Sequence, residues 1–439
     1  MANPMARRLA VGAPIVAFVI ALLVFGAVND GPQERADERS SARPLVVAGS
    51  GASTDATIAA LQEQIRAGVR PAPLAQLGGA YLQKVRETGD VTYYARAEDA
   101  LDAALENDSK DLEAVTGLGT LALARHDFRA ALDLGRRARR LAPAAVSPLP
   151  IVVDALVELG RYGQAARTLQ SLLDRKPGVP AYARASYVRE LRGDLPGAVQ
   201  AMKLAVSAAG GAGEGAAYVQ TLLGSLHFAS GGVRDARAAY RSALRAEPGF
   251  PAALAGIART DAAAGRLGSA IRRLREVVQR LPLPEYVVSL GEAELAAGRP
   301  RAARRDFALM DVQRRLIADS GGNADLEFAL FEANHGDPRA GVDLARKTWA
   351  AAPSIRSADA LGWALTRARR PAAGLEWAKR ALRLGWREPS VLYHAGMSAR
   401  AAGRPGEARR ILTRLHDQSP RFSPLYGPRV GRALRALGG

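Results

Sequence analysis

Histidine and acidic side chains could perform acid–base or metal chemistry in this chain, but their spacing argues against both. The five histidines stand singly, with no HExxH motif and no histidine and carboxylate at the spacing of metal ligands. Cysteine is absent, which excludes a thiolate nucleophile, a disulfide framework and a zinc–thiolate site. We therefore expect no enzyme activity, no metal and no cofactor. The histidines are interpreted as structural or surface residues: His126, His227, His335, His394 and His416.

Phosphate-binding and nucleophile motifs are also missing from the sequence. No GxSxG elbow or Walker loop occurs, and the glycine-rich run 210–215 lacks the Lys-Ser/Thr pair and the strand that a phosphate loop needs. Carboxylate pairs such as Glu292 and Glu294 fall on an amphipathic helix, where a solvated surface is the simpler interpretation. The function of the chain is therefore sought in binding, on the elements that position a binding surface.

The composition predicts an all-helical chain. Of its 439 residues, 48% are hydrophobic, mainly Ala and Leu, and only 5% are aromatic. Such stretches favour helix over strand. The formal net charge is +18, and nearly all basic residues are arginine. This excess reflects a GC-rich genome, or it attracts the chain to an anionic surface.

The N-terminus contains a candidate membrane anchor. Arg7 and Arg8 precede Leu9–Val28, an uncharged run that is long enough to span a bilayer. The two arginines should hold the N-terminus in the cytoplasm and place the rest of the chain outside. The alternative is a protein secreted after cleavage of this run as a signal peptide. We expect a cytoplasmic N-terminus over 1–8, a transmembrane helix or signal anchor over 9–28 and a flexible linker over 29–55.

Beyond the linker, the sequence repeats with a period close to 34 residues. Pro143 and Pro177 are 34 residues apart, and so are Pro248 and Pro282. In most units a Leu-Gly pair or its equivalent is followed by a turn glycine and then by a second small residue. This spacing predicts a helix, a tight turn and a second helix in each unit.

Small residues should let the two helices of a unit approach each other closely. We expect Gly224 to face Ala236 in one unit and Gly291 to face Ala303 in another. A larger side chain at Gly224 should overpack the pair and cost about 1 to 3 kcal/mol.

Together, these offsets resemble the tetratricopeptide repeat. The clearest unit, 217–250, carries the family's Leu-Gly, Gly, Ala, Tyr, Ala and Pro, with Gln220 at the position that Trp usually holds. The resemblance implies an all-α fold: a right-handed superhelical solenoid of about ten helix-turn-helix units over 56–422, preceded by one transmembrane helix. Residues 423–439 should form a capping helix. The units begin near Pro71, Leu112, Val146, Val179, Ala217, Pro251, Pro284, Gly322, Ile355 and Pro389.

In this family the first helix of each unit lines a concave groove, which is the default binding site. Aromatic rings beside arginines on such a surface suit an extended peptide or a helix as the ligand. The opposing interpretation is that Trp363 and Tyr393 only pack against neighbouring units. The family's register assigns ten residues to a protein-binding groove: Tyr218, Phe228, Arg259, Glu292, Asp359, Trp363, Arg367, Tyr393, Met397 and Arg400.

Clustered arginines fall mostly on the second helices or turns, and therefore on the convex side. We expect a membrane-anchored scaffold that holds another protein of unknown identity, in an assembly or transport role. The alternative is a basic solenoid that binds a polyanion: an anionic lipid, a cell-wall polymer or, only if the domain is cytoplasmic, nucleic acid. The clusters are Arg136-Arg137, Arg139-Arg140, Arg272-Arg273, Arg304-Arg305, Arg314-Arg315, Arg369-Arg370 and Arg409-Arg410.

Overall fold

Apolar residues three and four positions apart give each helix a buried face, and glycine turns end many of the first helices. In α12 (Val233–Ala246), for example, Ala236, Tyr240 and Ala243 are fully buried. The turn before this helix contains Gly231, whose φ of +82° is a backbone conformation that glycine adopts without steric cost. The local pattern of each unit therefore produces two antiparallel helices.

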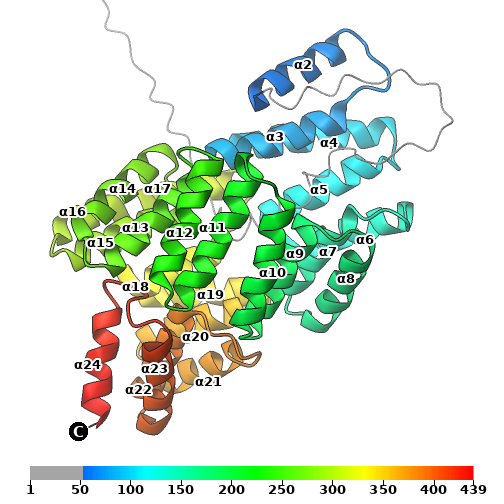
Figure 1. Cartoon of the computed structure of the whole chain (residues 1–439). Helices are drawn as coiled ribbons and strands as arrows, with labels where there is room; N and C mark the ends of the chain where they lie inside the picture. The colour runs from blue at the N-terminus through cyan, green and yellow to red at the C-terminus, as the bar shows by residue number, and fades with distance from the viewer. Residues whose placement is uncertain (1–52, 439) are drawn as a thin grey trace, which may run out of the picture.

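The computed structural model describes residues 53–438, and within this range the chain is helical with no strand (Figure 1). Helix α2 (Thr54–Arg66) precedes ten helical pairs, and α24 (Gly427–Gly438) follows them. The first helices of the pairs are α3 (Leu74–Thr88), α5 (Leu112–Ala124), α7 (Pro148–Glu158), α9 (Val179–Leu191), α11 (Gly213–Ala229), α13 (Pro251–Ala263), α15 (Pro284–Ala296), α18 (Asp325–His335), α20 (Ile355–Arg367) and α22 (Pro389–Ala401). The second helices are α4 (Thr92–Asn107), α6 (Phe128–Leu141), α8 (Tyr162–Arg175), α10 (Leu195–Ala208), α12, α14 (Leu267–Arg280), α16 with α17 (Pro300–Phe307 and Leu309–Asp319), α19 (Pro338–Ala351), α21 (Pro371–Ala381) and α23 (Pro405–Gln418).

The expected helical solenoid is therefore present, and several unit boundaries coincide with the repeat spacing. Six first helices begin at the predicted first residue of a unit: α5, α9, α13, α15, α20 and α22. The seventh unit departs from the pattern, because its second helix is divided into α16 and α17 at Ala308.

At Gly224 and Gly291, the nearest side chain across the unit is an aromatic ring and not the expected small residue. A Cβ added at Gly224 would meet the ring of Tyr240 at 2.6 Å, and one added at Gly291 would meet the ring of Phe307. The expected facing residues, Ala236 and Ala303, lie one helical turn earlier. Side chains on a helix lean toward its N-terminus, so an aromatic ring one turn later reaches back over the glycine. These two glycines therefore make room for a ring, whereas in the ninth unit small residues meet at the expected offset, because a Cβ added at Gly374 would lie 2.7 Å from the carbonyl oxygen of Gly362.

Successive turns of the solenoid touch each other, at an offset of five units. The amide of Asn323, in the loop between the seventh and eighth units, donates to the carbonyl oxygen of Arg125 in the second unit over 3.0 Å. The same relationship joins later units: a Cβ at Gly160, Gly193 or Gly231 would collide with the carbonyl oxygen of Pro353, Gly385 or Gln418. Helices α20 to α23 consequently lie close to the middle of the chain, and the solenoid is closed on itself rather than open (Figure 1).

The predicted membrane segment over 9–28 lies outside the described residues, as do residues 1–8 and most of the predicted linker over 29–55. Among the helices of residues 53–438, none combines the length and the apolar character that a bilayer crossing requires. At the other end, α24 follows Pro420 and packs on α23, where the sequence predicts a cap over 423–439.

Candidate functional site

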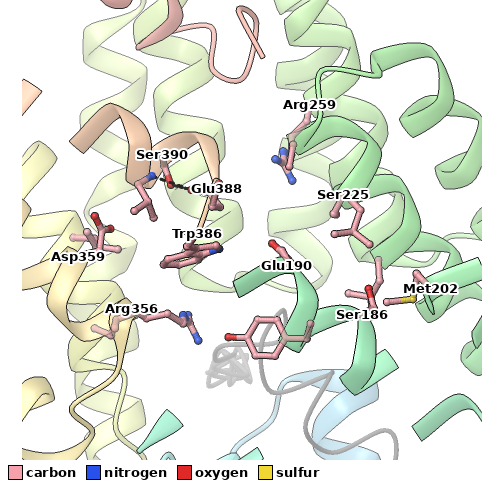
Figure 2. Close-up of a pocket in the computed structure, with 17 residues that line it drawn as sticks. Ser186, Glu190, Met202, Ser225, Arg259, Arg356, Asp359, Trp386, Glu388 and Ser390 are labelled. Carbon is pink, nitrogen blue, oxygen red and sulfur yellow. Dashed lines mark hydrogen bonds between the residues drawn. The ribbon is translucent and has the colours of Figure 1, made fainter. Parts of the chain in front are cut away.

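A pocket of about 330 Å³ opens where the first helices of the middle units meet those of the last units. One wall comes from α9, α10, α11 and α13, and the other from α18, α20 and the segment that enters α22 (Figure 2). The two walls are brought together by the contact between successive turns, because Gly193 at the end of α9 lies against Gly385, the residue before Trp386. The pocket is therefore a product of the closed solenoid.

Arg356 occupies the floor of the pocket and is neutralised by carboxylates. Its guanidinium lies 3.6 Å from Glu158 and 3.9 Å from Glu327. Burial disfavours its charge, but the attraction of Glu158, Tyr187 and Glu327 outweighs this effect and raises the pKa of Arg356. The hydroxyl of Tyr187 also bonds to Glu158, at 3.3 Å. The guanidinium of Arg356 is therefore engaged by carboxylates of the chain itself.

Glu190 and Glu388 face the pocket from opposite walls. Burial, followed by the charge of Glu388, raises the pKa of Glu190 to about 7. Glu388 precedes α22 and accepts hydrogen bonds from the Ser390 hydroxyl and, at 3.0 Å, from the Val391 amide. The Glu190 side chain makes no hydrogen bond or ion pair within residues 53–438. Two carboxylates thus border one small space, and one of them has no partner in the described chain.

Trp386 and Arg259 complete the polar lining. Trp386 is 8% exposed, and its indole nitrogen has no hydrogen-bond partner in the described part of the chain. Arg259 extends from α13 and lies over the Phe228 ring at 4.5 Å, without an ion pair among the described residues. Figure 2 shows Trp386 between Glu388 and Arg356, with Arg259 on the far side of the space. Besides the paired Arg356 and Asp359, the pocket therefore presents the carboxylates of Glu190 and Glu388, the guanidinium of Arg259 and the unpaired N–H donor of Trp386.

Five of the ten residues assigned to the groove are buried, and two of these form a packed group with His394. The ring of Trp363 stacks on His394 at 4.6 Å, and its nitrogen donates to Asn334 over 2.8 Å. His394 in turn bonds to Asp359 at 2.9 Å. This arrangement matches the packing interpretation of Trp363 and not that of a free anchor. The buried residues are Tyr218, Phe228, Asp359, Trp363 and Tyr393.

The chain's own C-terminal segment covers another part of the expected groove. Tyr426 lies 5.0 Å from Tyr393, and its hydroxyl donates to Glu292 over 2.9 Å. His335 bonds to the same carboxylate oxygen at 3.0 Å. Glu292 and Tyr393 are therefore engaged by the segment that leads into α24, and this end of the concave surface is occupied.

The remaining groove residues lie apart from the pocket or at its edge. Arg367 is exposed and donates to the Ala333 carbonyl over 2.9 Å, Met397 is partly buried and Arg400 is exposed. Of the ten predicted residues, the structure brings Arg259 and Asp359 to the pocket. Sequence reasoning missed Glu190 and Trp386, because the repeat register treats the end of a first helix and the loop between units as connections. A tryptophan in such a loop was the available signal.

The histidines and acidic residues show no metal-binding arrangement in residues 53–438, where no three of them converge on a common point. Burial lowers the pKa of His126 to about 4, with the charge of Arg356 adding to the effect. His126 has a positive φ of 61° in the turn after α5 and stacks on Phe128 at 5.3 Å. It is a structural residue of the turn that contacts Asn323.

Models of the tetratricopeptide repeat match four parts of the chain. The matched residues are 90–146, 153–213, 227–290 and 390–421. These matches cover units in the first, middle and last parts of the solenoid. No curated protein matches the sequence.

Several solved structures are similar in fold. The human IFIT1 dimer with PPP-AAAA shares 16% identity at a TM-score of 0.48, over 74% of this chain and 76% of that chain. TTC0263, a thermophilic TPR protein of Thermus thermophilus, shares 21% identity at a TM-score of 0.38, over 43% and 96%. A tetratricopeptide repeat protein of Parabacteroides merdae shares 18% identity at 0.39, over 56% and 97%. At these scores, neither the geometry nor the ligands of these proteins are carried over to this chain.

Proposed function

Because its repeats are those of the tetratricopeptide family, we propose that this chain is a scaffold that binds another protein and catalyses no reaction. Stacked repeats of this kind create extended concave surfaces suited to recognition rather than to chemistry. The observation that supports the proposal best is the pocket between α9–α13 and α18–α22, which combines apolar walls with a few polar groups. The bound segment of the partner is expected to reach this pocket.

The residues that we expect to contact the partner differ from those predicted from the sequence. Trp363 and Tyr393 are 4% and 3% exposed, so a partner can reach them only after local opening. Arg259 is accessible, lines the pocket and has no ion pair in the described chain. We therefore place the contact with the partner around Arg259, and not on the buried rings of Trp363 and Tyr393.

We further propose that residues 9–28 tether the scaffold to the cell membrane, with the repeats on the extracytoplasmic side. The uncharged run Leu9–Val28, preceded by Arg7 and Arg8, supports this location. Fractionation of cells, followed by protease treatment of intact spheroplasts, tests it. The full chain should remain with the membrane and be digested from outside, whereas a soluble, released form would indicate signal cleavage.

In-cell crosslinking followed by affinity capture tests the scaffold proposal. The proteins captured by the native chain are compared with those captured by the Arg259→Ala and Arg241→Ala variants. Arg241 is an exposed arginine of α12 and serves as the matched control. A discrete protein partner should be captured by the native and Arg241→Ala chains and reduced for Arg259→Ala. Equal capture by all three chains would place the partner elsewhere on the solenoid. Absence of any protein partner would refute the scaffold function.

A second candidate function, polyanion binding, is favoured by the exposed arginines of the second helices. Arg139, Arg140, Arg304, Arg305 and Arg409 are all exposed. Counterion release predicts that binding to such a surface weakens steeply with salt, so anionic vesicles should bind the native chain at about 50 mM salt and release it at about 200 mM. Capture of a protein partner that persists across this range would instead support the scaffold.

A further inference from the structure

We propose that the pocket binds the ammonium or guanidinium group of a lysine- or arginine-like ligand. Glu190 and Glu388 would hold the cation, and Trp386 would donate a hydrogen bond to an acceptor of the same ligand. The inference deepens the proposed function and rests on it where the cation belongs to a protein partner. A free basic amino acid offers the same chemistry, and the experiment below separates the two sources.

The charges around the pocket leave an uncompensated carboxylate. At the floor, Arg356 lies between two carboxylates, 3.6 Å from Glu158 and 3.9 Å from Glu327, so these carboxylates already have a cationic partner. Asp359 is likewise paired, with His394 at 2.9 Å. Glu190 has no such partner within residues 53–438, although it borders the pocket. A ligand cation would therefore meet a carboxylate that Arg356 attracts from a distance but that has no hydrogen bond or ion-pair contact in the described chain.

Glu388 strengthens the same site from the opposite wall. Its carboxylate caps α22 through the Val391 amide at 3.0 Å, so its position is held by the start of that helix. The proximity of this second negative charge is one reason why Glu190 resists ionisation. A cation between the two would relieve their repulsion, in the way that opposite charges stabilise ionised carboxylates. The chain is strongly basic overall, with a net charge of +18, and yet this pocket contains the acidic pair.

Trp386 supplies an independent sign of a missing ligand. Buried polar groups in folded proteins are almost always hydrogen-bonded, whereas the indole N–H of Trp386 is buried and has no acceptor in the described chain. An N–H donor requires an acceptor, which a bare metal ion or a simple alkylamine does not offer. A lysine or arginine residue carries a carbonyl oxygen near its cationic side chain, and an indole ring also attracts cations through its face.

The size of the pocket fits one such residue with part of its backbone. Its volume is about 330 Å³, at the lower end of the range for small-ligand pockets. Its walls include the apolar side chains of Met202, Leu226 and Val391, which suit the methylene stem of a long basic side chain.

Binding should depend on pH through Glu190. The pKa of this carboxyl is about 7, so its charge and the affinity for a cation should both rise as the pH increases through about 7. The neighbouring charges that face Glu190 are few and belong to different elements. They are Tyr187 on α9, Arg259 on α13, Arg356 and Asp359 on α20, and Glu388 before α22.

The experiment is calorimetric titration of the full chain, purified in a neutral detergent, with acetyl-Ala-Arg-Ala-amide and acetyl-Ala-Lys-Ala-amide. The neutral peptide acetyl-Ala-norleucine-Ala-amide is the ligand control, and free arginine tests the small-molecule source. Binding of either basic peptide at least tenfold tighter than the neutral peptide is expected. The affinity should fall tenfold or more in Glu190→Gln, by a few-fold in Trp386→Phe and not at all in Glu276→Gln, an exposed carboxylate of α14. Tighter binding of the peptides than of arginine assigns the cation to a protein, and the reverse order assigns it to a free amino acid.

Several outcomes would overturn the inference. The first is that no cationic probe binds at millimolar concentration, and the second is that the norleucine peptide binds as tightly as the basic peptides. The third is that Glu190→Gln changes neither the affinity for the basic peptides nor the pH dependence of that affinity. Circular dichroism melts of each variant verify folding, and Trp386→Phe keeps the test valid if Glu190→Gln unfolds the chain. Capture of a protein partner without any cation binding would reject this inference alone, whereas loss of the partner as well would reject the scaffold proposal too.

Discussion

The backbone amide of Ile355 donates a 2.8 Å hydrogen bond to the hydroxyl of Tyr162, 193 residues earlier in the chain. Tyr162 begins the second helix of the third unit, and Ile355 begins the first helix of the ninth. The bond therefore links two successive turns of the solenoid, and it satisfies one of the amides that a helix start leaves without an internal partner. The same hydroxyl group is held partly buried, and burial raises the pKa of Tyr162 to about 12.

Removing this hydroxyl should weaken the contact between the turns. We expect Tyr162→Phe to lower the free energy of unfolding by about 1 kcal/mol, because the Ile355 amide loses its acceptor. Hydrogen exchange at the start of α20 should become faster. Tyr182→Phe is the control, since the Tyr182 hydroxyl makes no hydrogen bond within residues 53–438. Equal exchange at α20 in both variants would show that the bond contributes little.

Adding a methyl group at Gly193 should separate the turns. Alanine at its φ of +74° costs about 1 kcal/mol from backbone strain alone, and the new Cβ would also collide with the carbonyl oxygen of Gly385. Gly265 has a similar φ of +77° but open space around its Cβ, so Gly265→Ala measures the strain by itself. Gly193→Ala should be the less stable variant and should have the larger radius of gyration in X-ray scattering. Equal stability and equal radius of gyration of the two variants would mean that the turns separate at Gly193 without a measurable cost in free energy.

Replacing a helical glycine by alanine should change the free energy of unfolding in opposite directions at two positions. Gly224→Ala brings a Cβ to 2.6 Å from the Tyr240 ring, and we expect it to lower the free energy of unfolding by about 1 to 3 kcal/mol. Gly79→Ala in α3 meets nothing within 4 Å and should raise it by about 0.5 to 1 kcal/mol, because alanine favours helix. Urea denaturation of the two variants checks the signs. Stabilisation by both would contradict the close approach of Tyr240 to Gly224.

The stability of the chain should decline as the pH rises toward neutrality. Burial raises the pKa of Glu190 and of Glu327 from 4.5 to about 7, so the folded state keeps protons that the unfolded chain releases. The resulting stabilisation is complete below about pH 4.5 and is lost as the pH rises through about 7. The difference between the melting temperatures measured below and above about pH 7 should therefore become smaller in Glu190→Gln and stay unchanged in Glu276→Gln. An unchanged difference in Glu190→Gln would assign the decline to other groups.

Local features of the fold were largely predictable from the residues. Proline and glycine spacing placed the starts of α5, α13 and α20 at Leu112, Pro251 and Ile355, because these signals act over one or two helical turns. The expected pairing of Gly224 with Ala236 missed the nearest neighbour of the glycine, since the spacing of small residues does not reveal that the Tyr240 ring reaches back over it. Of the ten residues that the family's register assigned to a groove, Arg259 and Asp359 line the pocket, and the burial of Trp363 against His394 agrees with the alternative that this ring packs against a neighbouring unit.

The sequence by itself determined that the described chain is helical, that it repeats and where most units begin, because each of these follows from contacts between residues close in the chain. Only the tertiary structure decided that the turns touch, that Tyr426 covers Glu292 and that Glu190 faces Glu388. These relationships depend on the small rotation between neighbouring units, which accumulates over five units before Gly193 meets Gly385. No short-range sequence pattern specifies this accumulated rotation, so the pocket could not be predicted from the sequence.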